Sequence, residues 1–235
     1  ITAENVAKDY NVTRADMDAF ALTSQTRAAN AIEKGYFKDQ ITPVKITKKR
    51  EEFAFDTDEH VRGETTADGL ASLRPAFDKE GQVTAGNSSG INDGAAALIL
   101  GNAEKVEKSN KSPLAKIVSY GFGGVAPRIM GMGPVPASKM ALERAGLKVS
   151  QIDIVESNEA FAAQACAVSK ELGLPSDIVN PNGGAIALGH PVGATGAIIM
   201  TKLIYELHRT GGRYGLATMC IGGGQGIAVI IDTQV

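Results

Sequence analysis

The 235-residue sequence has few cysteines, almost no net charge and no long hydrophobic run. Two cysteines and an N-terminus without signal-like character fit a reducing cytoplasm rather than a disulfide-stapled secreted fold. A formal net charge of −2 gives no reason to expect nucleic acid or another polyanion as a partner. Because no apolar stretch is long enough to cross a bilayer, we expect no membrane span.

The chain does have a hydrophobic share of 43%, which is ample for the core of one large domain or two smaller ones. It is also rich in glycine, with 27 in all. Residues 180–197 read NPNGGAIALGHPVGATGA and contain one histidine, His190. Apolar residues at helical spacing follow, so a helix is predicted over 194–209. A short apolar run at 177–179 precedes the segment and predicts a strand.

His190 lies between Gly189 and Pro191, at the junction of the glycine-rich loop and the helix. Proline restricts the residue before it to extended geometry, and glycines let a backbone approach a ligand closely. A histidine held in this way is oriented toward a partner. The competing interpretation is a buried, hydrogen-bonded loop histidine, which is the commoner case for a histidine considered alone.

Two other stretches also end a predicted strand on a polar group. In the first, a strand at 154–155 runs into Asn158 and then a helix, where Ser157 or Asn158 could simply cap that helix with Glu159 in its first turn. In the second, strands at 216–219 and 227–231 flank a glycine turn that starts at Cys220. A cysteine is usually a small core hydrophobe, but this one adjoins four glycines and no bulk.

Three strand ends therefore carry an amide, an imidazole and a thiol, on Asn158, His190 and Cys220. Ligands of open α/β sheets gather at the carboxyl ends of strands. A thiol near a histidine can be held as a thiolate, which acts as a nucleophile or a base, and bare amides can stabilise an oxyanion. Because no carboxylate or second cysteine joins them at ligand spacing, a metal site is not expected.

The three stretches together resemble the thiolase family, close to its biosynthetic acetoacetyl-CoA type. The similarity lies in NEAF at 158–161, GHPVGATG at 189–196 and CIGGG at 220–224, in that order and spacing. The resemblance covers the whole chain. It implies an α/β fold, with a thiolase-like mixed sheet covered by helices and preceded by a mostly helical loop domain.

The resemblance also implies a domain division. Residues 1–90 would form the loop domain that binds coenzyme A, and residues 113–235 the C-terminal domain. Residues 91–112, with the apolar run 95–100, would supply the last buried strand and helix of an otherwise absent N-terminal domain. The resemblance implies that the nucleophilic, acylated cysteine belongs to that absent part.

The implied activity is the condensation of two acetyl-CoA to acetoacetyl-CoA and coenzyme A, or the reverse thiolysis. Cys220 would be the general acid/base. His190 would assist acylation and, with a water held by Asn158, would donate to the thioester oxygen of the second substrate. The Gly222 N–H would be a donor of the other oxyanion hole.

The implied substrate-binding residues are Ser89 for pantetheine, Arg62 for the nucleotide end, Met130 for the acyl pocket, and Ala160 and Phe161 beside Asn158. The plain alternatives are a turn-forming Ser89, an Arg62 in a surface salt bridge and a packing role for Met130. No cofactor is expected, because the coenzyme A thioester is the substrate. Expected partners are acetyl-CoA, acetoacetyl-CoA, coenzyme A, the N-terminal half with its cysteine, and further copies of the chain as a tetramer or dimer.

Three other functions remain open at this point. A ketoacyl synthase has the same architecture, although the CIGGG block belongs to thiolases. A non-catalytic coenzyme A-binding half and a purely structural fragment are the others.

The remaining elements are predicted from local patterns. Thr13 with Asp16 forms a capping box for a helix that Gly35 ends. The chain should also contain a β-hairpin about the turn 47–50, helices near 70–73 and over 137–145, and a strand at 117–118.

Overall fold

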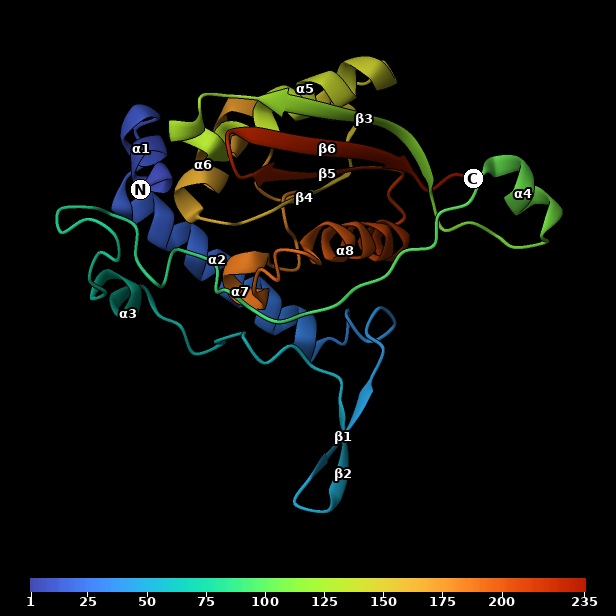
Figure 1. Cartoon of the computed structure of the whole chain (residues 1–235), viewed down its shortest axis with the longest axis horizontal. Coiled ribbons are helices and arrows are strands. Elements are labelled where there is room, and N and C mark those ends of the chain that lie inside the picture. Colours follow the sequence, from blue (N-terminus) through green and yellow to red (C-terminus); the bar gives the residue numbers. More distant parts are fainter.

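The computed structural model describes all 235 residues and has a four-stranded mixed sheet at its centre (Figure 1). The strands lie in the order β3-β6-β5-β4. Their bounds are β3 Lys116–Gly124, β4 Ile154–Ser157, β5 Tyr214–Ile221 and β6 Gln225–Asp232. The β3/β6 and β6/β5 pairs are antiparallel and the β5/β4 pair is parallel, so the mixed sheet is as predicted.

The helices cover both faces of this sheet (Figure 1), but residues 34–66 and 72–102 contain no helix, so the N-terminal part is less helical than expected. The α-helices are α1 Thr2–Asp9, α2 Arg14–Glu33, α3 Ala67–Ala71, α4 Ala103–Lys108, α5 Pro134–Ala145, α6 Ala162–Leu172, α7 Ala185–Leu188 and α8 Thr195–Thr210. Two 3-10 turns, Pro127–Met132 and Val149–Gln151, flank α5. The short helix α7 was not predicted, and the predicted strand at 177–179 is reduced to a single bridge between Val179 and Val155.

Alternate residues of the strands face two different hydrophobic clusters. Val155, Leu216 and Ile230 belong to the larger cluster, which includes residues of α5, α6 and α1. Their chain neighbours Ile154, Ala217 and Ile231 belong to a smaller cluster with α8. This period of two is the pattern expected of a sheet that is covered on both faces.

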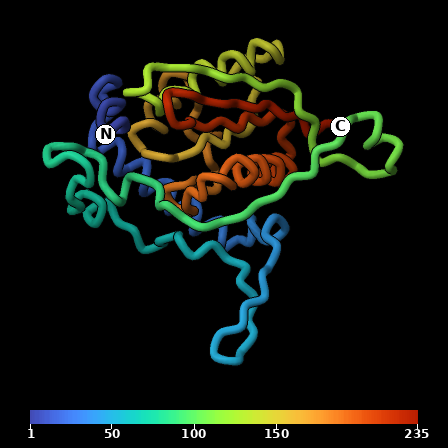
Figure 2. Tube along the Cα trace, viewed as in Figure 1, coloured from blue at the N-terminus to red at the C-terminus, as the bar shows by residue number.

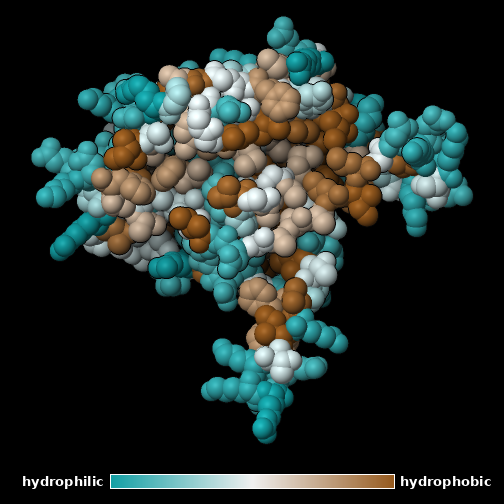
Figure 3. All heavy atoms as spheres, in the orientation of Figure 1, coloured by the Kyte–Doolittle hydropathy of each residue, from teal (hydrophilic) through white to brown (hydrophobic).

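On the sheet face that packs against α8, the residues of β3 are left uncovered. Ile117, Tyr120 and Phe122 of this strand are 47%, 53% and 55% exposed, whereas Ser119 and Gly121 between them are buried against α5. Figure 3 shows apolar side chains gathered over this part of the sheet. The chain therefore presents an uncovered hydrophobic sheet face.

The segment between α3 and α4 differs most from its prediction. Residues 95–100 form no strand in this chain, and Ile99 and Leu100 are 101% and 75% exposed, so the strand expected within an otherwise absent N-terminal domain stays a prediction. A strand needs neighbours to hydrogen-bond with, and none of the strands pairs with this run. The following helix α4 is as predicted. Figure 2 traces the extended segment past α7 and α8 to α4.

The predicted hairpin is present and projects from the body of the molecule (Figure 1). Its strands are β1 Val44–Lys48 and β2 Glu51–Phe55, and every residue of both is exposed. The capping box at the start of α2 is also confirmed, because the Thr13 hydroxyl accepts from the Asp16 N–H while Asp16 accepts from the Thr13 N–H.

Candidate functional site

His190 lies in the link between α7 and α8, and two backbone contacts fix it there. Its N–H donates to Asn92 Oδ1 at 3.1 Å, and residue 190 forms a β-bridge with Ile91. Gly189 has φ +97°, and a Cβ on it would lie 2.7 Å from the Asn92 amide. Glycine is therefore required before His190, for backbone conformation and for space.

The imidazole of His190 contacts two side chains, one at each nitrogen. Nδ1 lies 2.7 Å from Thr195 Oγ1, and Nε2 lies 3.3 Å from Asn158 Nδ2. Partial burial lowers the pKa of His190, because desolvation disfavours the imidazolium. The predicted pairing of Asn158 with His190 is thus present in the structure, and neutral imidazole is the favoured form.

Asn158 does not cap α6, so that alternative was wrong. The first helical residue follows Phe161, and Gln164 accepts from the Phe161 N–H. Asn158 instead sits beyond β4, where its N–H donates to the Thr218 carbonyl and its own carbonyl accepts from Gln164 Nε2. Its side-chain oxygen is buried without a partner. Such an atom in a native site calls for an explanation, and an active-site water or ligand is one.

Glu159 points away from Asn158 into the protein and is 1% exposed. Its carboxylate accepts from Ser24 Oγ at 2.7 Å, Asn180 Nδ2 at 2.8 Å and the Ile186 N–H at 3.1 Å. Ser24 also accepts from the Gly184 N–H. The placement of Glu159 in the first turn of a helix was therefore wrong. This buried carboxylate joins α2 to the glycine-rich segment that carries His190.

A buried ion pair supports the same segment from α8. Lys202 Nζ lies 2.8 Å from Glu156 Oε2 and donates to the Gly183 carbonyl at 2.6 Å. Both side chains are at least nine-tenths buried. Burial raises the pKa of Glu156 to about 7, with the charge of Lys202 opposing the shift.

Cys220 is in β5 near the same end of the sheet. Thr218 pairs with Ser157 at the end of β4, so Cys220 lies two residues beyond that pair and Asn158 one residue beyond it. The thiol is 8% exposed, and burial raises its pKa to about 11. No hydrogen bond joins it to His190, so the thiolate that a nearby histidine can hold is not favoured in this chain. Gly222 is exposed in the turn that follows, outside the β5/β6 ladder.

Ser89 contacts the 158–161 motif directly. Its N–H and its hydroxyl both donate to the Ala160 carbonyl, at 3.1 and 3.2 Å, and Ser88 forms a β-bridge with Phe161. Two residues further on, Ile91 and Asn92 reach His190. Residues 88–92 therefore connect the predicted pantetheine residue to the imidazole.

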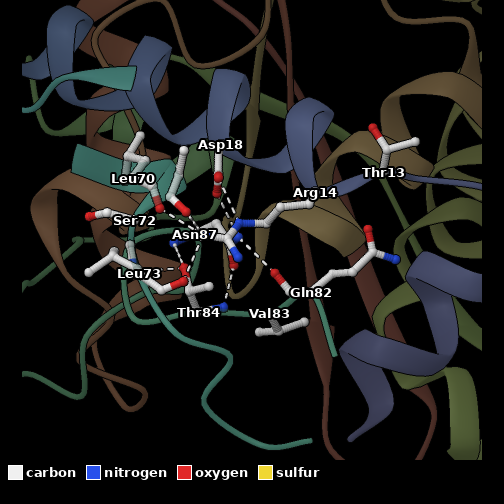
Figure 4. Close-up of polar contacts among 12 residues, drawn as sticks. Thr13, Arg14, Asp18, Leu70, Ser72, Leu73, Gln82, Val83, Thr84 and Asn87 are labelled. Atoms are coloured by element: carbon white, nitrogen blue, oxygen red, sulfur yellow. Dashed lines mark hydrogen bonds and ion pairs between the residues drawn. The ribbon is translucent and has the colours of Figure 1, made fainter. Parts of the chain in front are cut away.

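A polar network holds this loop against α2 (Figure 4). Arg14 Nε bonds Asp18 Oδ2 at 2.6 Å, and the other oxygen of Asp18 accepts from Asn87 Nδ2 at 2.9 Å. Arg14 also donates to the carbonyls of Leu70 and Leu73. The Thr84 N–H donates to Asn87 Oδ1, which closes the turn before Ser89.

Arg62 and Met130 lie outside these contacts. The Arg62 side chain is exposed and forms no salt bridge, so the surface-pair alternative was wrong, and its N–H donates to Gln25. Met130 is half-buried in the 3-10 turn before α5. His60 is half-buried, with Nδ1 3.1 Å from the Ala187 carbonyl.

Sequence reasoning missed three residues that orient the site: Asn92, Thr195 and Glu159. Asn92 and Glu159 act through the tertiary fold, on groups 98 and 135 residues away, and no local pattern reveals such pairs. Thr195 is five residues from His190, and its position at the first turn of α8 was a usable signal.

No group of three or more His, Cys, Asp or Glu side chains is placed to hold a metal ion. No helix is both long and apolar enough to traverse a bilayer.

Comparison with known proteins shows that the chain matches two family models. Residues 1–104 match "Thiolase, N-terminal domain", and residues 111–233 match "Thiolase, C-terminal domain". Among curated relatives, the β-ketothiolase BktB of Cupriavidus necator is 59% identical over 233 residues, and the acetyl-CoA acetyltransferase of Escherichia coli is 55% identical over 232. Each alignment covers 99% of this chain and 59% of the relative, so the chain spans about three-fifths of their length.

Solved structures agree with this. The acetyl-CoA acetyltransferase of Bacillus anthracis has a TM-score of 0.96 and 51% identity, covering 98% of this chain and 59% of that one. Human mitochondrial 3-ketoacyl-CoA thiolase in complex with CoA has a TM-score of 0.92 and 46% identity, covering 100% and 58%.

Proposed function

Because this chain belongs to the thiolase family, we propose that it carries the acid/base and oxyanion-stabilising part of an acetyl-CoA acetyltransferase. The reaction is the condensation of two acetyl-CoA to acetoacetyl-CoA and coenzyme A, or its reverse. The observation that carries the proposal is the gathering of Asn158, His190 and Cys220 at one end of the β4/β5 strand pair.

Cys220 is assigned the proton transfers. In condensation its thiolate removes the α-proton of the second acetyl-CoA, and in thiolysis it takes the proton of the incoming thiol. The assignment rests on the position of Cys220 and not on its protonation, because a pKa of about 11 leaves little thiolate near neutral pH. The Gly222 N–H, in the turn next to it, is assigned to an oxyanion hole.

His190 and Asn158 are assigned to the thioester oxygen, where negative charge develops as the enolate forms. The buried, unpartnered oxygen of Asn158 beside the imidazole suits it to hold a water at this point. Removing one such donor costs about 3 kcal/mol in the barrier of a typical enzyme. No resident cofactor is required, because coenzyme A itself carries the acyl group.

The substrate is assigned to the surface that leads to this site. Ser89, hydrogen-bonded to Ala160 and beside Phe161, would border the pantetheine arm. Arg62, exposed and without an acid partner, would meet the nucleotide phosphates, and Met130 would border the acyl group. The domain division 1–90, 91–112 and 113–235 remains part of this proposal, as do a cytoplasmic location and a dimer or tetramer.

The nucleophile is assigned to an N-terminal half that acts as a partner of this chain. Cys166 is mid-helix, half-buried, and its pKa is raised to about 12, mainly by burial, so it is a poor candidate for the acylated thiol. Cys220 cannot carry the acyl group and act as base at the same moment. These two facts also favour the alternative that the chain by itself binds coenzyme A without turning it over.

The test supplies the chain with the upstream half of a relative and compares Cys220→Ala with Cys166→Ala. Cys220→Ala should abolish turnover while radiolabelled acetyl-CoA still acylates the upstream cysteine. Cys166→Ala should keep both steps. If Cys220→Ala loses acylation in parallel with turnover, Cys220 is not mainly the acid/base of the second step.

Coenzyme A binding is tested separately. Ser89→Trp should raise the Michaelis constant for coenzyme A more than Arg62→Ala, because a bulky side chain beside Ala160 would fill the pantetheine path. A matched Ser72→Trp change, at another exposed serine turn of the same region, should have no effect. Unchanged kinetics in Ser89→Trp would remove this residue from the site.

A further inference from the structure

Thr195 is the closest polar neighbour of the His190 ring. Its hydroxyl oxygen lies 2.7 Å from His190 Nδ1 and 3.0 Å from the Pro191 carbonyl, and the residue is 2% exposed. It opens α8, so the helix fixes its position relative to the preceding loop.

The two contacts of Thr195 assign the proton of the imidazole. A carbonyl oxygen can only accept, so in the bond to Pro191 the hydroxyl of Thr195 donates its single proton. Its lone pairs then face His190 Nδ1, which must be the N–H of the neutral ring. The other nitrogen, Nε2, is left with a bare lone pair.

The second side chain on the ring is consistent with this arrangement. Asn158 presents its Nδ2, which can only donate, to His190 Nε2 at 3.3 Å. Contacts from two different elements, one at each nitrogen, therefore give the same proton position.

We propose that Thr195 is a positioning residue that sets the tautomer of His190, so that the neutral ring carries its proton on Nδ1 and presents a lone pair at Nε2 to the site. Partner-dependent tautomer control of this kind is general for functional histidines.

The consequence for catalysis rests on the proposed function. With its lone pair free at Nε2, neutral His190 is a base toward the thiol of the upstream cysteine that becomes acylated. The S–H bond of that thiol breaks, the electron pair stays on sulfur, and the proton forms a new Nε2–H bond. Only the imidazolium so formed can donate from Nε2 to a thioester oxygen. His190 would therefore act first as an acceptor and afterwards as a donor.

The tautomer is measured on the 235-residue chain itself, without activity. The chain has three histidines, so a multiple-bond proton–nitrogen spectrum of the protein labelled with ¹⁵N-histidine resolves three rings. His60→Gln and His208→Gln identify the signals of His190. We expect a protonated Nδ1 and a bare Nε2 for His190 at pH 8, where the ring is neutral.

Two variants complete the experiment. Thr195→Ser keeps the hydroxyl and should keep the Nδ1–H form. Thr195→Val keeps the shape without the hydroxyl and should shift His190 toward the Nε2–H form. A wild-type His190 with a protonated Nε2 overturns the proposal, as does a folded Thr195→Val chain with an unchanged tautomer. If Thr195→Val does not fold, the spectra of the wild type and of Thr195→Ser still show whether the proton of His190 is on Nδ1.

A kinetic arm uses the chain assembled with its upstream half. Thr195→Val should lower kcat/KM by about 10- to 100-fold, the range for lost outer partners of functional histidines, with Thr195→Ser near wild type. Because the imidazolium loses an acceptor at Nδ1, the acid limb of the pH profile should also move to lower pH. If Thr195→Val has the altered tautomer but an unchanged acid limb of the pH profile, the catalytic consequence is refuted and the tautomer assignment stands. If the wild-type chain combined with its upstream half is inactive, the proposed function is refuted and the tautomer assignment again stands.

Discussion

At the residue scale, the thiol of Cys220 is governed by its burial. A pKa of about 11 leaves a very small thiolate fraction near neutral pH, and the thiolate is the reactive form toward alkylating agents. In a Cys166→Ala background, iodoacetamide should therefore label Cys220 roughly 100-fold or more slowly than a free thiol at pH 7.5.

The rate should rise with pH up to about 11, as followed by intact mass. Labelling in urea supplies the control, because the unfolded thiol should react at the free rate. Fast labelling of the folded chain at pH 7.5 would mean that a neighbour holds Cys220 as thiolate.

The sequence was sufficient to single out Asn158, His190 and Cys220 as candidates because glycines and strand ends mark them locally. It was not sufficient for the partners that orient them. Asn92 has no glycine-rich or helical context to single it out, and its contact with the His190 N–H exists only once the 88–92 segment lies beside the α7–α8 link. The raised pKa of Cys220 was not predictable for a similar reason, because burial is a tertiary property.

At the scale of elements, the Glu156–Lys202 pair joins β4 to α8 and to the Gly183 carbonyl. Removing one partner of a buried pair typically costs about 3–5 kcal/mol. Lys202→Met should therefore be strongly destabilising at pH 8, where Glu156 must either stay charged without a partner or take up a proton from water.

The pH dependence of that cost has a definite sign. The folded-state pKa of Glu156 is raised to about 7 from 4.5, so the folded chain binds a proton that the unfolded chain releases between these values. This contribution to stability is complete below about pH 4.5 and lost by about pH 7. Urea unfolding should show a smaller cost of Lys202→Met at pH 5.5 than at pH 8, and a Glu156→Gln/Lys202→Met double variant should remove the difference. An equal cost at both pH values would contradict it.

Secondary structure was predictable where the pattern is local. The Thr13–Asp16 capping box, the hairpin and α8 have local signals and are present. The run 95–100 is as apolar as a buried strand, and only the lack of a neighbouring strand makes it irregular. Hydrophobicity predicts that a segment can be buried, whereas pairing decides whether it becomes a strand.

At the scale of the whole molecule, the chain alone should show no turnover. Thiolase chemistry needs one group to carry the acyl unit and another to move the proton, and only Cys220 is suited to either task here. A steady-state assay of the purified chain at high concentration measures this. Turnover above the uncatalysed rate, with no second polypeptide in the mass spectrum, would show that the nucleophile is wrongly assigned.

The uncovered sheet face should make the isolated chain associate. Tyr120 and Phe122 stack edge to face at 5.7 Å on it, and apolar patches of this kind drive self-association. Phe122→Ser should lower the weight-average mass in sedimentation, whereas Val44→Ser, an equally exposed change on the distant hairpin, should not. The same mass for Phe122→Ser and wild type would place the association elsewhere.

The short stretch 88–92 has a consequence for how the length of this protein can vary. It touches Phe161 through Ser88, Ala160 through Ser89, and His190 through Ile91 and Asn92. Inserting or deleting one residue there would shift the contacts of this extended stretch by about 3.3 Å and turn its shifted side chains to the opposite side. Related sequences should therefore keep this stretch free of gaps, while the exposed 47–50 turn can lengthen or shorten freely.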